Sequence, residues 1–474
     1  MPGTDRLLLI NAVMGQFFTG FASRIFIVAL PTIAAALDAD ILGISWALIA
    51  YQLASISLSV VFGRLGDVHG RYAIYGVGFA IMAVSSLLCG LAGTVILLVL
   101  FRATQGIGAA MISSATRVLA MDAMPEGSEG KANGLMTMSY HAGFLVGPPL
   151  GGLVIDWLGW RWAFFLLVPL GVAGVALTAM RARRGRPVSR GARPPIDYVG
   201  AALLVAITVA LTLLLDRQSA AIVGAGRPIA IALVLVGALV GFVVQELRAS
   251  HPIVNFALFR IRMFTASVVS LLVLGTANSV LGFLLPFYMQ GVLGLSPSFM
   301  GLVFLGAPVA TIVCASLSGV LTDRLGPRPP TSIGIVLTLG AFAVGFLLRV
   351  DSSWLLPALA MIFTGLGTGF FNTANQAALV GSVPKEYRGF ATGMVQTVFG
   401  VGSLLGISLT GLLMTTAFRH YTGTAGLAPT PDQPGPFVAA INATCLACAT
   451  LVALALAASL TRGRARIEAA PRLD

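Results

Sequence analysis

Charged residues are scarce in this 474-residue chain: Asp, Glu, Lys and Arg together make up 10% of it, while 57% is hydrophobic and the mean hydropathy is +0.94. A soluble fold of this length cannot enclose so many apolar side chains, so an integral membrane protein is indicated. The net charge of +12 does not indicate nucleic-acid binding, because the basic residues lie singly or in short loops between apolar runs, where they signal membrane topology.

Reactive groups are equally scarce. All four cysteines lie within apolar runs, and Cys445 and Cys448 share a helix face without a nearby His or carboxylate, which argues against a metal site. Paired carboxylates, metal-binding clusters and a nucleophile with a base at membrane depth are also missing, so we do not expect an enzyme. The lack of a soluble domain argues against a sensor. We expect no cofactor, no nucleic-acid partner and no obligate protein partner.

Apolar runs long enough to cross a bilayer as helices occur fourteen times. They begin near residues 7, 44, 73, 94, 132, 160, 198, 228, 263, 298, 331, 354, 389 and 437. Because no small-residue cleavage site follows the first run, we expect it to remain as a span. Placing both termini in the cytoplasm puts most of the 29 Lys and Arg residues on that side, with six arginines in residues 181–193. The expected location is the cell membrane.

A short polar turn between two apolar runs occurs twice. Residues 63–72 read Gly-Arg-Leu-Gly-Asp-Val-His-Gly-Arg-Tyr, and residues 319–328 read Gly-Val-Leu-Thr-Asp-Arg-Leu-Gly-Pro-Arg. Both copies keep two Gly, the Leu and the Asp in register, which indicates a duplicated unit. Three glycines of the first half also recur 259 residues later, as Gly106 and Gly365, Gly108 and Gly367, and Gly147 and Gly406.

The duplication predicts four regions. Residues 1–181 form an N-terminal six-helix bundle, residues 182–262 hold a basic cytoplasmic loop and two inserted transmembrane helices, and residues 263–460 form a C-terminal six-helix bundle. Residues 461–474 are a cytoplasmic tail. Two bundles built from parallel repeats are the construction expected of a rocking secondary transporter, with its substrate site near the midplane between the halves.

Three motifs resemble those of the major facilitator superfamily. The turn at residues 63–71 resembles its cytoplasmic signature, residues 102–109 resemble its fourth-span motif, and residues 143–152 resemble the fifth-span motif typical of its antiporters. With fourteen spans the chain is similar to the drug:proton antiporter branch, which carries two extra helices. The resemblance implies an all-α integral membrane protein with the major facilitator fold, two six-helix bundles plus two inserted transmembrane helices, and a role in multidrug or natural-product efflux.

The resemblance assigns a latch role to the repeated turn, which is thought to secure one bundle against the other in one state. Glycines let two helix ends approach closely, and an acid can sit at a neighbouring helix N-terminus. A turn that only follows the positive-inside rule is the alternative. The cytoplasmic latch residues are Gly63, Gly66, Asp67, Gly70, Arg71, Asp323 and Arg328.

Small residues recur at every fourth position of the fifth span. Gly143, Gly147 and Gly151 form a smooth face against which another helix can pack closely, and Pro148 can bend the helix there. The resemblance adds Gly152 and implies that this antiporter motif lies between the halves and limits leak. A generic close-packing seam is the alternative.

Three arginines lie within spans, where a central arginine costs on the order of 3 kcal/mol. Arg117 is close to a cytoplasmic end and can extend its charge to the interface. Arg102 lies deeper, and Met361 stands at its duplicate position, so the shared fold does not require a base there. The resemblance implicates Arg102 in coupling substrate to protons; a structural arginine bonded to backbone carbonyls is the alternative.

Arg24 departs from the related antiporters, whose first span usually carries an acid where this chain has Ala22. No Asp or Glu lies deep in any predicted span. A cavity with two arginines and no carboxylate would attract an anionic or zwitterionic group and repel lipophilic cations. Alternatively, Arg24 is bonded to polar neighbours such as Gln16 or Gln105 and never meets substrate.

His141, at mid-depth in the fifth span, is the candidate for proton coupling, because an imidazole ordinarily titrates near pH 6.5. A packed histidine is the alternative, and coupling through Asp67 is another. Uncharged polar residues complete the candidate substrate and coupling site, although each could instead form a helix–helix hydrogen bond. They are Gln52, Gln105, Asn278, Gln290, Asn372, Asn375 and Gln376.

Together these features predict a secondary active transporter that exports amphipathic small molecules by proton antiport with alternating access. The molecule would be a drug, a natural product or a lipid-like compound with an anionic or zwitterionic head. The expected partners are this substrate, protons and membrane lipids, with the proton gradient as driving force. The alternative is an organic-anion or nutrient importer on the same fold, which Arg24 favours and the fifth-span motif disfavours.

Overall fold

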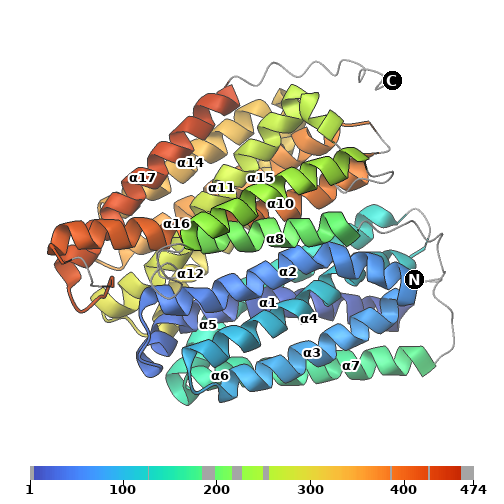
Figure 1. Ribbon diagram of the computed structural model, residues 1–474, viewed down its shortest axis with the longest axis horizontal. Helices are drawn as coiled ribbons and strands as arrows, with labels where there is room; N and C mark the ends of the chain where they lie inside the picture. Colours follow the sequence, from blue (N-terminus) through green and yellow to red (C-terminus); the bar gives the residue numbers. More distant parts are fainter. Residues whose placement is uncertain are drawn as a thin grey trace. The chain divides into compact units, whose positions relative to one another are not determined.

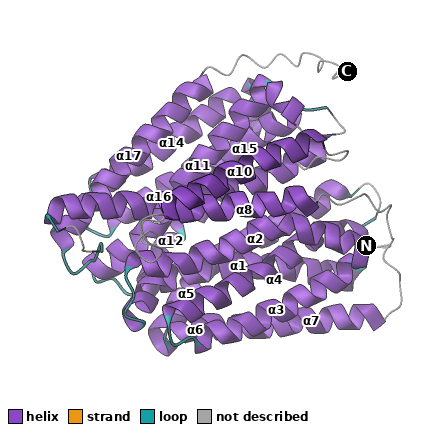
Figure 2. Ribbon diagram, in the orientation of Figure 1, coloured by secondary structure: helices purple, strands orange, loops and turns teal. Residues whose placement is uncertain are grey.

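The computed structural model describes residues 5–125, 128–183, 198–215, 227–248, 256–384, 387–424 and 428–460. Across these residues the regular structure is helical, and Figure 2 shows no strand among them. Because a bilayer core offers no water to backbone N–H and C=O groups, a chain this apolar must satisfy them within helices.

Helices lie at all fourteen places where the sequence predicts a span. Those of the first half are α1 (Arg6–Ala36), α2 (Ile41–His69), α3 (Arg71–Leu91), α4 (Val95–Asp122), α5 (Glu129–Leu158), α6 (Trp160–Phe165), α7 (Leu167–Arg183), α8 (Tyr198–Leu215) and α10 (Arg227–Arg248). Those of the second half are the 3-10 helix η1 (Phe256–Arg260), α11 (Arg262–Phe287), the π-helix η2 (Tyr288–Val292), α12 (Pro297–Phe304), α13 (Gly306–Leu325), α14 (Arg328–Phe346), α15 (Leu355–Gly381), α16 (Arg388–Thr422) and α17 (Pro434–Leu460).

Twelve segments of the described residues are long and apolar enough to cross a membrane, which indicates a multi-pass membrane protein. Some join two consecutive helices, as in Trp160–Arg181 and Pro297–Leu325. Helices α5 and α8 occupy the two other predicted positions but are not among the twelve, so the total of fourteen spans stays a prediction.

The described helices divide into two compact units (Figure 1). Unit 1 comprises α1 to α7, α8 as far as Leu211, α10 and the segment Ser296–Gly301; unit 2 comprises η1, α11, η2 and the helices from Leu302 to α17. The four domain boundaries proposed from the sequence stay predictions. Residues 184–197, which hold most of the basic loop, and the tail at residues 461–474 lie outside the described part.

Equivalent helix pairs pack through equivalent glycines in the two units. Helix α4 crosses α2 at Gly106, where an added Cβ would overlap the carbonyl oxygen of Tyr51, and α15 crosses α13 at Gly365, where it would overlap that of Ala307. These contacts confirm the duplication indicated by the glycine spacing. The next crossings repeat as well: α3 meets α4 at Gly78 and Gly108, and α14 meets α15 at Gly334 and Gly367.

Both copies of the polar turn contain a glycine in the left-handed region of backbone space. The φ angle is +98° at Gly70, between α2 and α3, and +81° at Gly326, after α13. Side chains other than glycine rarely adopt these angles. This backbone requirement explains why the Gly at the eighth position is kept in both copies.

An ion pair holds the start of α1 within unit 1. The Asp5 carboxylate accepts a hydrogen bond from the Leu8 N–H at 3.2 Å and pairs with the Arg181 Nε of α7 at 2.7 Å. At the corresponding place in unit 2, the start of α11 is held by an apolar cluster around Leu258 and Phe264.

Candidate substrate and coupling site

Arg24 lies where α1 crosses α5. Gly147 makes room for it, since a Cβ added at Gly147 would lie 3.0 Å from the Arg24 Cβ. The half-buried Arg24 side chain places its guanidinium over the Phe144 ring, 4.0 Å from the ring centre. Its Nε is buried and has no hydrogen-bond partner, and among the described residues no carboxylate pairs with it.

The ring contact does not offset the cost of this charge. A cation–π contact contributes about 0.5–2 kcal/mol, whereas an arginine at the centre of a span costs about 3 kcal/mol or more. The structure does not show the hydrogen bonds to Gln16 or Gln105 that the alternative interpretation of Arg24 proposed: Gln105 accepts from Arg102 and donates to Ser86, and within the described chain no hydrogen bond joins Arg24 to Gln16. Among the described residues, no hydrogen bond or ion pair compensates the charge of Arg24.

Arg102 is sealed inside unit 1, with none of its surface exposed. Its guanidinium lies between the rings of Phe26 and Tyr51, 4.2 Å from each ring centre. Its Nε donates to the Ala47 carbonyl oxygen at 3.2 Å, and its Nη1 donates to Gln105 Oε1 at 2.6 Å. The Nη2 has no partner in the described residues.

These contacts match the alternative of an arginine bonded to a backbone carbonyl, and a role for Arg102 in coupling substrate to protons stays a prediction. Gln105 extends the network by donating its Nε2 to Ser86 Oγ of α3 at 2.7 Å. Arg102 thus joins α1, α2, α3 and α4 at one level. Because Phe26 follows Arg24 by two residues, Arg102 also helps to fix the part of α1 that carries Arg24.

His141 is exposed and belongs to an aromatic cluster on α5. Its ring centre lies 5.8 Å from that of Tyr140 and 6.1 Å from that of Phe144, and the Tyr140 and Phe144 centres are 4.9 Å apart. Arg24 lies over the same Phe144 ring, so the structure brings together two residues that the sequence singled out separately. A coupling role for His141 stays a prediction.

The polar candidates of unit 2 do not gather at one depth. Asn375 is buried and donates its Nδ2 to the Ser267 carbonyl oxygen at 3.1 Å, near the start of α11. Gln290 lies in η2, 23 residues beyond Ser267, which is about 34 Å along a helix axis. The two therefore cannot contact one small ligand together, and Asn375 matches the alternative of a helix–helix hydrogen bond.

The other uncharged candidates lie on partly open surfaces. Gln52 follows Tyr51 on α2 and is half-buried. On α15, Asn372 is half-buried and Gln376, four residues on, is exposed on the same face. Asn278 of α11 has a buried Oδ1 without a partner in the described residues.

A sequence profile of the Major Facilitator Superfamily matches residues 12–247 and 267–466. This chain belongs to the major facilitator superfamily. It is similar to a multidrug transporter protein of Bacillus subtilis, with 29% identity over 86% of this chain and 75% of the relative. It is also similar to the tetracenomycin C resistance and export protein of Streptomyces glaucescens, with 31% identity over 86% and 76% of the two chains. These relatives confirm the resemblance to the drug-exporter branch.

The fold of this transporter is also found among solved structures. A bacterial homologue of the human lysosomal transporter Spinster, in an inward-facing and unoccupied conformation, superposes with a TM-score of 0.69. The match covers 96% of this chain and 97% of the other at 15% identity. At that identity the likeness shows the major facilitator fold alone.

The antiporter motif of this transporter packs within unit 1. An added Cβ at Gly143 would overlap the Phe17 carbonyl oxygen, and one at Gly151 would lie 2.6 Å from Ile25 Cγ1, so the glycine face rests on α1. This corrects the expectation that the whole face lies between the halves. Pro148 stands within α5, which continues past it to Leu158.

The last glycine of the motif has a different partner. An added Cβ at Gly152 would overlap the carbonyl oxygen of Pro297, in the segment Ser296–Gly301 that groups with unit 1. Beside it, Asp156 accepts a hydrogen bond from the Ser298 N–H at 2.9 Å. The missing side chain at Gly152 therefore lets α5 approach the start of α12.

The latch residues are only partly described. Gly66 lies against Arg71, since a Cβ added there would be 3.2 Å from Arg71 Cγ, and Gly63 has its nearest neighbour at Ser114. Asp323 is exposed. The side chain of Asp67 lies outside the described part, and both Arg71 and Arg328 have interaction partners. The latch role stays a prediction.

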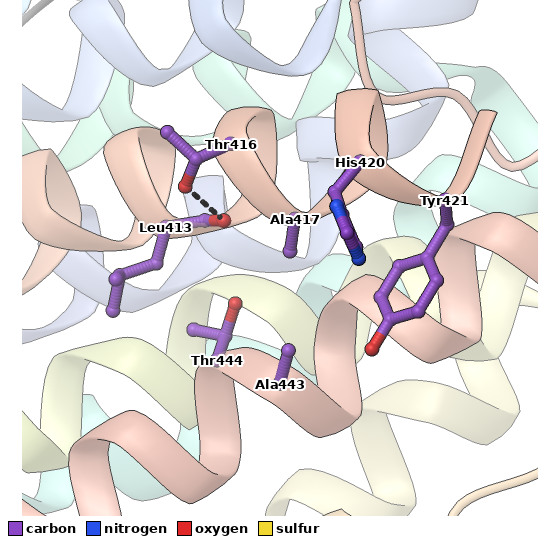
Figure 3. A pocket seen from close by; sticks show the side chains of 7 residues that line it. All are labelled: Leu413, Thr416, Ala417, His420, Tyr421, Ala443 and Thr444. Atoms are coloured by element: carbon purple, nitrogen blue, oxygen red, sulfur yellow. Dashed lines mark hydrogen bonds between the residues drawn. The ribbon is translucent and has the colours of Figure 1, made fainter. Parts of the chain in front are cut away.

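A cavity of about 340 Å³ lies between α16 and α17 in unit 2 (Figure 3). It contains none of the residues that the sequence singled out. Figure 3 shows Thr416 and Thr444 on facing helices, with the rings of His420 and Tyr421 at one side. The complete lining is Leu413, Thr416, Ala417, His420, Tyr421, Ala443 and Thr444.

The sequence did not reveal the aromatic partners of the two arginines. Phe26, Tyr51 and Phe144 are common residues in apolar spans, and nothing in their local pattern marks them as cation partners. At the 259-residue offset of the shared glycines, Phe144 aligns with Ser403 but Arg24 aligns with Phe283. Only the structure pairs Arg24 with Ser279, because Gly147 meets Arg24 and its equivalent Gly406 meets Ser279.

Proposed function

We propose that this chain is a secondary active exporter of amphipathic small molecules that works by proton antiport with alternating access. The observation that carries the proposal is the similarity, over 86% of the chain in each case, to one relative named a multidrug transporter and to another named a resistance and export protein. The cargo would be a drug, a natural product or a lipid-like molecule. The proton gradient would supply the driving force.

The proposed location is the cell membrane, with both termini in the cytoplasm. This orientation rests on the positive-inside rule, because most of the 29 Lys and Arg residues then fall in cytoplasmic segments. Export in this orientation means that substrate binds from the cytoplasm or the inner leaflet and leaves outside.

A specific observation favours a second candidate, an organic-anion or nutrient importer on the same fold. Arg24 presents a positive charge without an ion-pair partner among the described residues, two residues after Ala22, where the resemblance places an acid. A cation on α1 attracts anionic cargo. The direction of transport distinguishes the two candidates.

Uptake into inside-out vesicles with an imposed pH gradient tests the proposal, using one lipophilic cation and one amphipathic anion as cargo. Exporter activity predicts accumulation of at least one of them that collapses when a protonophore removes the gradient. Accumulation only in right-side-out vesicles would favour the importer. Vesicles without the protein provide the baseline for passive partitioning.

A further inference from the structure

We propose that Arg24, held over the Phe144 ring, binds the anionic head of the transported molecule. The cargo is then an amphipathic acid, with a carboxylate, sulfonate or phosphate attached to an apolar body, and not a lipophilic cation. This inference rests on the proposed transport function and adds the chemical class of its substrate.

The first support is the distance to the carboxylate that lies nearest along the chain on each of the two helices that hold the cation. Asp156 follows Phe144 by twelve residues, about 18 Å along α5, and already accepts the Ser298 N–H. Asp38, beyond the end of α1, follows Arg24 by fourteen residues, about 21 Å at the same rise. Neither helix supplies a counter-ion at the level of Arg24.

The second support is access. Arg102 is closed between two rings and has no exposed surface, whereas Arg24 is half-buried and has a ring on one face of its guanidinium. A planar guanidinium presents paired N–H donors that match the two oxygens of an oxyanion. The Tyr140 and Phe144 rings beside it offer flat apolar surfaces for the body of the ligand.

The third support comes from the equivalent crossing in unit 2. Gly406 of α16 faces Ser279 of α11 as Gly147 faces Arg24, with an added Cβ 2.9 Å from the Ser279 Cβ. There the Ser279 Oγ donates to the Ser403 Oγ at 2.7 Å, so a neutral pair closes the crossing. The packing of these helices therefore does not require a cation.

Binding of a matched pair of fluorescent probes to the protein in phosphatidylcholine nanodiscs tests the inference. The anion is 1-anilinonaphthalene-8-sulfonate, and the neutral control is N-phenyl-1-naphthylamine, which has the same rings without the sulfonate. We expect Arg24→Ser to weaken sulfonate binding at least tenfold and Arg24→Lys to weaken it less. Binding of the neutral probe should change less than about twofold, and Arg117→Gln, which removes another span arginine, should leave both affinities unchanged.

Thermal unfolding tests whether a loss of sulfonate binding results from a loss of folded structure. Because the charge of Arg24 has no ion-pair partner among the described residues, the Arg24→Ser protein should be at least as stable as the native protein. The double variant, Arg24→Ser with Phe144→Ser, places in unit 1 the same pair of serines that closes the crossing in unit 2. The sulfonate probe should raise the Tm of the native protein and not that of Arg24→Ser. Equal sulfonate affinity in the native and Arg24→Ser proteins, or a large loss of stability in both serine variants, would overturn the inference.

One further measurement tests whether Arg24 binds cargo or a lipid headgroup. A second one, vesicle transport, distinguishes a failure of the substrate class from a failure of the export function. Adding phosphatidylglycerol to the nanodiscs should not displace the probe; displacement would assign Arg24 to a lipid phosphate and overturn its assignment to cargo. If vesicles transport a cationic or neutral amphiphile and Arg24→Ser does not change the affinity for the sulfonate probe, the inference fails and the export function stands. If vesicles transport neither class while sulfonate binding depends on Arg24, the export function fails and the anion subsite stands.

Discussion

Two equivalent helix crossings, one in each unit, are alike in the glycine that lets the helices approach and differ in the side chains that face it. At Gly147, α5 meets a cation that lies on an aromatic ring; at Gly406, α16 meets a serine that is hydrogen-bonded to another serine. A second pair of positions shows the same contrast, since the sealed Arg102 of α4 corresponds to the buried Met361 of α15. The glycines are common to both units, whereas at each of these two pairs of positions the arginine stands in unit 1 and an uncharged residue stands in unit 2.

The contrast separates what the fold requires from what unit 1 adds. A glycine at a tight helix crossing is required because the facing backbone leaves no room for a Cβ, and this holds in either unit. An arginine in a span is costly, and the absence of one at either equivalent position of unit 2 shows that the helices pack without it. The positive charges of unit 1 therefore call for a functional explanation.

The largest expected effect is on the shared glycines. An Ala at Gly143 would force its Cβ into the Phe17 carbonyl oxygen, and an Ala at the equivalent Gly402 would do the same to that of Leu272. Since the contact in each case is with backbone and not with a flexible side chain, we expect each substitution to cost about 1–3 kcal/mol or more. The measurement is thermal unfolding of the purified variants.

Matched controls lie on the same helices. Gly134 of α5 and Gly393 of α16 have no atom within 4 Å of an added Cβ, so alanine there should leave the Tm unchanged or slightly higher. Stable Gly143→Ala together with unstable Gly402→Ala would break the equivalence of the two crossings.

The next effect concerns Arg102. Arg102→Met, which places the unit 2 residue in unit 1, should keep the protein folded and reduce transport by at least about tenfold, because Phe26, which follows Arg24 by two residues on α1, loses the group that fixes it. Vesicle transport together with size-exclusion chromatography measures both. Normal transport by a folded Arg102→Met protein would reduce Arg102 to a dispensable part of the scaffold.

A smaller effect is expected at His141, whose equivalent position in unit 2 is Gly400. If His141 carries the coupled proton, His141→Gln should flatten the dependence of transport on pH between about 5.5 and 7.5, where an imidazole titrates. Initial rates across this range measure the effect. An unchanged pH profile would remove His141 from the coupling scheme and leave Asp67 as the candidate.

The smallest effect on stability is expected at the start of the first helix of unit 1, which an ion pair holds, whereas an apolar cluster holds the first helix of unit 2. Asp5→Asn removes the ion pair with Arg181 but keeps a side chain that can cap α1, so the loss should be about 0.5–1 kcal/mol and should shrink at high salt. Asp5→Ala also removes the cap and should lose about 1 kcal/mol more. Salt-independent losses in chemical or thermal unfolding would show that the ion pair contributes nothing.

Residues whose role depends on the backbone were predictable, and those whose role depends on a distant partner were not. The spacing of Gly143, Gly147 and Gly151 predicted a close-packed face, because small residues four apart lie on one side of any helix. That this face rests on α1 required the structure. Likewise, the sequence predicted that Gln290 and Asn375 both belong to the substrate and coupling site. Only the contact of Asn375 with Ser267 showed that the two lie far apart along α11.

The sequence by itself determined a duplicated, all-helical membrane protein of the major facilitator superfamily, because lipid permits few backbone structures and each apolar run must satisfy its own hydrogen bonds. Arg24 and Arg102 were visible as span arginines, but the sequence did not show which groups surround either of them. Only the tertiary structure separated them, since the cost of a buried charge depends on which groups from other helices surround it. Arg102 is enclosed by Phe26, Tyr51, Gln105 and the Ala47 carbonyl oxygen, whereas in the described part of the chain the Arg24 guanidinium lies over the single ring of Phe144 and has no hydrogen bond or ion pair.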